Sequence, residues 1–66
     1  MVTFHPTAKR TLNGFKAMIC IRKSNGTRYG SRTGQEVFET AYAAKAEALY
    51  RALRAAERVP AFARVA

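Results

Sequence analysis

Acidic residues, cysteine and histidine are scarce in this chain of 66 residues. Its four glutamates all lie after residue 32, Cys20 is the only cysteine and His5 is the only histidine. One cysteine cannot form an internal disulfide, and no second cysteine or histidine is present to complete a zinc site with it. We therefore expect a domain that folds without a disulfide, a metal or any other cofactor.

A catalytic constellation is also missing from the sequence. The glutamates fall singly, and His5 precedes a proline near the N-terminus, whereas general acid-base catalysis needs groups within hydrogen-bond reach of one another. Cys20 has Lys16 and Arg22 on its side of a predicted strand, which would favour its thiolate. An unreactive cysteine at a half-buried strand position is the simpler interpretation. The sequence thus predicts a protein that is not an enzyme.

Long apolar runs are absent as well. No stretch approaches the roughly 20 apolar residues that span a bilayer, and no basic segment followed by an apolar one opens the chain. We expect a cytoplasmic protein without a membrane partner. The length allows one domain, residues 1–66, which would bury only roughly 60% of its unfolded surface. A hydrophobic content of 48% still favours a compact fold.

Basic residues are abundant, and they are unevenly placed. The formal net charge is +8. Residues 33–66 nearly balance five bases against four acids, whereas residues 1–32 contain no acid. The bases of that first part are Lys9, Arg10, Lys16, Arg22, Lys23, Arg28 and Arg32. Such an asymmetric field attracts polyanions, either nucleic acid or an acidic protein surface.

The middle of the chain predicts a three-stranded antiparallel β-meander over residues 14–39. Apolar and polar residues alternate over 14–23, as in a half-buried strand. Asn25-Gly26 then favours a two-residue type I′ hairpin turn. A second strand over 27–33 and a short third strand over 36–39, after Gly34, complete the predicted meander.

A helix is expected over 40–59, with Thr40 as its N-cap. The side expected to pack on the sheet comprises Tyr42, Ala46, Leu49, Leu53 and Ala56. The stripe expected to face water comprises Glu47, Arg51, Arg54 and Arg58. The band between them, proposed as a homodimer seam, comprises Ala41, Ala44, Ala48, Ala52 and Ala55. The predicted fold is therefore α+β: a small three-stranded antiparallel sheet packed by one C-terminal amphipathic helix.

The two ends allow two interpretations. Val2 and Phe4 suit a short strand before His5-Pro6, and Phe62 and Val65 suit a segment that covers a sheet edge. Alternatively, residues 1–13 and 60–66 are flexible.

The hairpin register decides which side chains share a face. A two-residue turn sets Arg22 opposite Tyr29 and Cys20 opposite Ser31. Tyr29 then lies away from the helix, where it can stack on a base or be covered by an arginine. The same register turns Arg28 and Arg32 toward the helix side. A bulge near Gly30, or a longer turn, would exchange the faces and bring Tyr29 into the core.

Two functions remain open from the sequence. The leading one is a non-enzymatic nucleic-acid-binding regulator or accessory factor that uses the basic hairpin, with DNA favoured over RNA. Its predicted contact residues are Lys16, Arg22, Lys23, Arg28, Tyr29 and Arg32, with a secondary basic surface at Arg51, Arg54 and Arg58. The alternative is a small protein-binding inhibitor or adaptor, of the kind that phages and other mobile elements encode. It would dock on an acidic patch of a larger protein complex, with an exposed Met18, Tyr29 or Phe38 as anchor.

Overall fold

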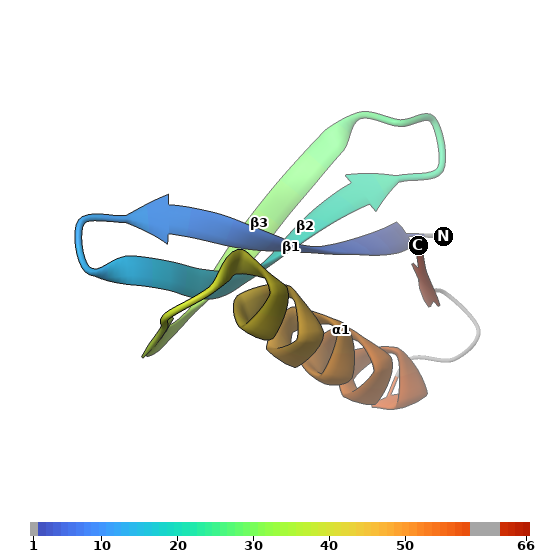
Figure 1. Ribbon diagram of the computed structural model, residues 1–66. Helices are drawn as coiled ribbons and strands as arrows, with labels where there is room; N and C mark the ends of the chain where they lie inside the picture. The colour runs from blue at the N-terminus through green and yellow to red at the C-terminus, as the bar shows by residue number, and fades with distance from the viewer. Residues whose placement is uncertain (1, 59–62) are drawn as a thin grey trace.

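The computed structural model, which describes residues 2–58 and 63–66, consists of one sheet with one helix packed on it (Figure 1). Its elements are β1 (Val2–Thr11), β2 (Gly14–Lys23), β3 (Arg28–Phe38), α1 (Ala41–Arg58) and β4 (Ala63–Val65). The strand order is β3-β2-β1-β4. The α+β class and the helix after the meander are confirmed. The three-stranded antiparallel sheet is wrong, because the sheet has four strands and β4 runs parallel to β1.

The N-terminal segment is a full strand inside the sheet, not a flexible end or a cap on an edge. β1 pairs with β2 along its whole length, from Val2 opposite Lys23 to Thr11 opposite Gly14. Pro6 made a long strand look unfavourable, because proline cannot donate to a ladder. It is tolerated because β4 pairs only with the first residues of β1. Beyond Phe4 no described strand pairs with the outer side of β1. Pro6 lies in this unpaired part, so the N–H that it lacks would have made no hydrogen bond to a neighbouring strand.

The C-terminal residues cover the edge of β1, as one of the two interpretations held. Val65 pairs with Phe4, and the Ala66 N–H donates to the Phe4 carbonyl oxygen at 2.9 Å. Phe62, the other residue expected to cover this edge, lies outside the described residues. The short β4 therefore protects the open end of β1 from pairing with another chain.

The β2–β3 turn is longer than the predicted type I′ turn. Gly26, with a φ of 87°, has a positive φ, but Asn25 does not, and a type I′ turn needs both. The Gly26 N–H donates to the Lys23 carbonyl, and the Lys23 N–H donates to the Thr27 carbonyl, each at 2.9 Å. These bonds define a three-residue loop that ends in a left-handed glycine. The Asn25 Oδ1 accepts the Thr27 N–H at 2.9 Å and holds the loop closed.

The longer loop shifts the register only at the tip of the hairpin. Arg22 lies opposite Arg28, and a bulge at Tyr29 then restores the predicted register, with Ile21 opposite Gly30 and Cys20 opposite Ser31. Arg28 therefore shares the face of Arg22, and its predicted position on the helix side is wrong. Arg32, opposite Ile19, does lie on the helix side.

The last two predicted strands are one strand, β3. A second irregularity interrupts its pairing, since Thr33 lies opposite Met18 whereas Val37 lies opposite Lys16. Gly34 falls within this irregularity and lies beneath the Arg51 side chain, where an added Cβ would come within 2.5 Å of Arg51 Nη1. The glycine bends the strand locally and does not end it.

The helix begins at its predicted cap, but its buried face is not the predicted one. The Ala43 N–H donates to Thr40 Oγ1 at 3.1 Å, which confirms Thr40 as the N-cap. Three alanines, Ala44, Ala48 and Ala52, are fully buried against the sheet, where they join Phe4 and Ile19 in the core.

The side predicted to be buried is largely exposed. Tyr42 is 86% exposed, Leu49 42% and Leu53 49%. The small alanine side chains let the helix lie close to the sheet, and the strands supply the bulk of the core. Ala44, Ala48 and Ala52, the middle of the band proposed as a homodimer seam, are consequently buried within the chain and do not face a second copy, whereas Ala41 is exposed and Ala55 is half-buried. No helix in residues 2–58 is long and apolar enough to cross a bilayer.

Candidate nucleic-acid interface

The face of the sheet away from the helix carries the largest set of aligned polar side chains. On β2 this uncovered face presents Lys16, Met18, Cys20 and Arg22, which alternate with the core residues Ala17, Ile19 and Ile21. Their partners on β1 are Lys9, Thr7, His5 and Thr3, and on β3 they are Val37, Thr33, Ser31 and Arg28. The uncovered face thus combines cations with small polar residues, Met18 and Val37, and none of these paired residues is acidic.

Two like-charged pairs lie directly across the ladder on this face. Lys9 is opposite Lys16, and Arg22 is opposite Arg28. Like charges directly opposite each other destabilise a sheet. Within the part of the chain that the structure describes, the one ion pair joins Glu47 and Arg51 on the helix, so no carboxylate offsets either pair. A bound anion would relieve this repulsion at both positions.

The two like-charged pairs lie at opposite ends of the uncovered face. Lys16 and Arg22 are six residues apart on β2, which corresponds to about 20 Å at roughly 3.3 Å per residue. Between them lie Met18 and a set of hydroxyl, imidazole and thiol side chains: Thr7, Thr33, His5, Cys20 and Ser31. Such groups can donate to phosphate oxygens but offer no aromatic surface other than His5.

Tyr29 and Lys23 form a contact at the tip of the hairpin. The Lys23 Nζ lies 5.5 Å from the centroid of the Tyr29 ring, and Tyr29 is 65% exposed. A cation does cover the tyrosine, but it is this lysine and not an arginine. Arg22 Nη1 instead donates to the Gly26 carbonyl oxygen at 3.2 Å. Although the strand is bulged at this point, Tyr29 stays out of the core and is accessible to a ligand.

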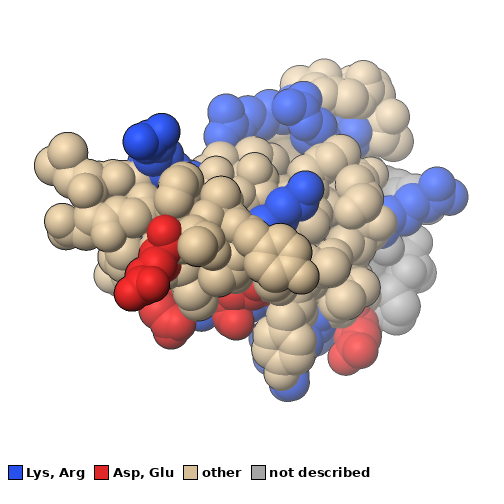
Figure 2. Space-filling view, in the orientation of Figure 1, with Lys and Arg blue, Asp and Glu red and all other residues tan. Residues whose placement is uncertain are grey.

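The helix arginines and Arg32 lie on the other side of the sheet. Arg32 joins Arg51, Arg54 and Arg58 around a groove between β3 and α1. Of the six predicted contact residues, the structure therefore brings Lys16, Arg22 and Arg28 onto the uncovered face and Lys23 and Tyr29 to its tip. Arg32 belongs with the secondary basic surface. In Figure 2 lysine and arginine side chains lie over the strands and also over the helix, whereas the acidic side chains in view lie toward the helix side.

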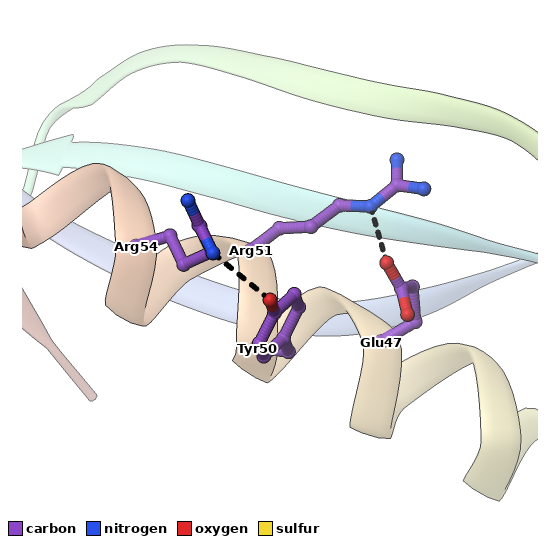
Figure 3. Close-up of polar contacts among 4 residues, drawn as sticks. All are labelled: Glu47, Tyr50, Arg51 and Arg54. Carbon is purple, nitrogen blue, oxygen red and sulfur yellow. Dashed lines mark hydrogen bonds and ion pairs between the residues drawn. The ribbon is translucent and has the colours of Figure 1, made fainter.

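Arg51 and Arg54 each contact a side chain about one helical turn earlier (Figure 3). Arg51 Nε donates to Glu47 Oε2 at 2.6 Å, and Arg54 Nη1 donates to the Tyr50 hydroxyl at 3.0 Å. The Arg54 guanidinium also lies 5.7 Å from the Tyr50 ring centroid. The hydrogen bond that Arg54 donates to Tyr50, followed by the charge interaction with the same residue, raises the pKa of Arg54 above its ordinary value. This guanidinium stays charged throughout the physiological range.

Lys9, Thr3, His5 and Thr7 were missed as residues of the candidate interface. The alternation of Val2 and Phe4 with Thr3 and His5 could have indicated them, had it been continued past Pro6. In the structure His5 lies opposite Cys20, but no hydrogen bond between their side chains is present. Among residues 2–58 and 63–66, no three histidine, cysteine or acidic side chains gather in a way that could hold a metal ion.

Comparison of this chain with protein-family models, curated proteins and solved structures finds no match. Its function must therefore be inferred from its own residues and their arrangement. The arrangement offers two separate cationic surfaces, the uncovered face of the sheet and the arginine-lined groove beside the helix. The first carries charge among small polar residues, and the second carries charge around an apolar floor.

Proposed function

We propose that this protein is a non-enzymatic DNA-binding protein, a small regulator or accessory factor, that contacts the phosphate backbone with the uncovered face of its sheet. The observation that carries this proposal is the pair of like-charged positions, Lys9 opposite Lys16 and Arg22 opposite Arg28. A monomer gains nothing from either pair. When a polyanion binds, its phosphates neutralise the repulsion within both like-charged pairs. The release of its condensed counterions then adds to the affinity.

The spacing of the cations favours duplex DNA. Their separation of about 20 Å exceeds the roughly 12 Å width of the B-DNA major groove, so the two ends of the face can contact the phosphate backbones on both sides of it. The deep, narrow major groove of A-form RNA does not admit side chains in the same way. These considerations support DNA over RNA.

The side chains between the cations favour phosphate contacts over base reading. Threonine and serine hydroxyls donate to phosphate oxygens, which positions a protein on DNA without selecting a sequence. Single-strand binders stack successive bases on several aromatic rings. Here Tyr29, at the tip, is the one exposed tyrosine on the three described strands β1 to β3. We therefore expect weak sequence preference, with Tyr29 contributing at one end of the site.

Paired substitutions test this assignment. The double variant Arg22→Gln/Arg28→Gln should weaken binding to random duplex DNA by at least about tenfold, since two phosphate contacts are lost. The matched control is Arg32→Gln/Arg58→Gln, which removes the same charge from the groove and should weaken binding much less. Fluorescence anisotropy with labelled duplex measures both. If the groove variant loses more affinity than the sheet variant, DNA does not bind to the uncovered face.

A further inference from the structure

A groove runs between strand β3 and helix α1, on the helix side of the sheet. Its volume is about 540 Å³. The helix packs mainly over β1 and β2, and β3 diverges from it toward the hairpin tip (Figure 1). The floor is apolar and consists of Phe4, Ala17, Ile19, Ile21 and Ala55. The rim carries Arg32 on the strand side and Arg51, Arg54 and Arg58 on the helix side.

The rim has a large excess of positive charge. Glu47 is the acid bonded to these arginines, and it accepts only from Arg51 Nε. Both Nη groups of Arg51 make no hydrogen bond to the described residues, and they form the forked edge that matches a carboxylate. Arg54 donates through one Nη1 hydrogen to the Tyr50 hydroxyl. A ligand of this groove must therefore be anionic.

The floor distinguishes between kinds of anion. Phe4, its one aromatic residue, is only 9% exposed, and Ile19 is 8% exposed. A nucleobase placed here would find no open ring on which to stack, and its polar edge would face aliphatic carbon without a hydrogen-bond partner. An aliphatic or phenyl side chain would bury its surface there at no such cost. The groove thus suits an anion that carries an apolar side chain.

The edge of the sheet adjoins the groove. β3 is the last strand in the order β3-β2-β1-β4, so its outer backbone groups have no strand partner in the described chain. An extended peptide can add to such an edge by backbone hydrogen bonds while alternate side chains enter neighbouring pockets. If an apolar side chain of the peptide occupied the floor of the groove, carboxylates two residues before or after it in the peptide would lie near the arginine rim.

We infer that this groove docks an acidic, extended peptide segment of a partner protein, with one apolar side chain on the floor and carboxylates on the arginine rim. Because the groove and the uncovered face lie on opposite sides of the sheet, the protein can hold such a segment without releasing a polyanion. The inference does not depend on the proposed DNA binding.

A designed peptide tests the inference. The probe is a short labelled glutamate peptide with one central leucine, and the matched control peptide has serine in place of that leucine. The leucine peptide should bind, and the serine peptide should bind about tenfold more weakly because it loses the apolar contact. Amide chemical-shift changes on titration should centre on Gly34 and Ala55. Equal binding of the two peptides, or no binding of either, would overturn the inference.

Variants of the protein separate the two surfaces. Arg32→Gln/Arg58→Gln should weaken binding of the leucine peptide by about tenfold. Arg22→Gln/Arg28→Gln should leave it nearly unchanged. These arginines are exposed, so neither variant should unfold, and thermal melts followed by circular dichroism check this. If both variants lost the same peptide affinity, the peptide would be held only by general charge attraction, which would contradict a groove site. Displacement of the peptide by single-stranded DNA would assign the groove to nucleic acid instead.

Discussion

Gly14 is the residue at which the backbone tolerates a side chain least. Its φ is 145°, and an added Cβ would overlap the Phe38 carbonyl oxygen and come within 2.9 Å of Val37 Cγ1. At this point the end of β3 crosses close to the start of β2. The position therefore needs glycine both for its conformation and for its space.

Substitution at Gly14 should accordingly destabilise the fold. We expect Gly14→Ala to lower the free energy of unfolding by about 1–3 kcal/mol, as measured by urea denaturation. Gly30→Ala is the control, because Gly30 has no positive φ and no atom would lie within 4 Å of its added Cβ. That variant should be neutral or slightly more stable. Equal losses for the two glycines would contradict the close approach at Gly14.

Helix α1 shows how an element can be predicted correctly while its orientation is not. The composition predicted that this helix exists, and the Thr40 cap predicted where it begins. Hydrophobicity then favoured the side with Leu49 and Leu53 as the buried one. The structure instead buries the alanines, because the distance between helix and sheet depends on which residues the sheet contributes. That information lies in Phe4 and Ile19, far away in the sequence.

A pair of helix substitutions tests this orientation. Ala48→Leu forces extra volume into a fully buried position and should cost about 1–3 kcal/mol of unfolding free energy. Leu53→Ala removes a half-exposed side chain and should cost about 1 kcal/mol or less. Denaturant unfolding of both variants gives the ranking. A larger loss for Leu53→Ala would put the leucine side of the helix in the core.

The hairpin combines a correct and an incorrect prediction. Alternation gave β2, and Asn25-Gly26 placed the turn, so Cys20 and Ser31 are paired as predicted. The loop has one more residue than predicted, and the bulge at Tyr29 compensates for it. Sequence alone does not reveal such paired irregularities, since each by itself would have moved every later side chain to the other face. The consequence is local but matters for the site, because it moves Arg28 to the uncovered face.

At the scale of the whole molecule, the two cationic surfaces lie on opposite sides of one sheet. The described chain measures 36 × 22 × 16 Å, a thin body of one sheet and one helix. The charge asymmetry along the sequence indicated a basic hairpin. It grouped Arg32 with the hairpin cations, although the predicted register already turned Arg32 toward the helix side, and it omitted Lys9. Lys9 was omitted because Pro6 concealed the length of β1, the strand that places Lys9 opposite Lys16.

The salt dependence of DNA binding reports how many phosphates the uncovered face contacts. With Lys9, Lys16, Arg22 and Arg28 each contacting a phosphate, the logarithm of the binding constant for random duplex should fall against the logarithm of salt concentration with a slope of about −3.6. A variant with glutamine at all four positions should bind weakly, with a slope near zero. Absence of wild-type binding at about 50 mM salt, or a slope that these substitutions leave unchanged, would contradict DNA binding by the uncovered face.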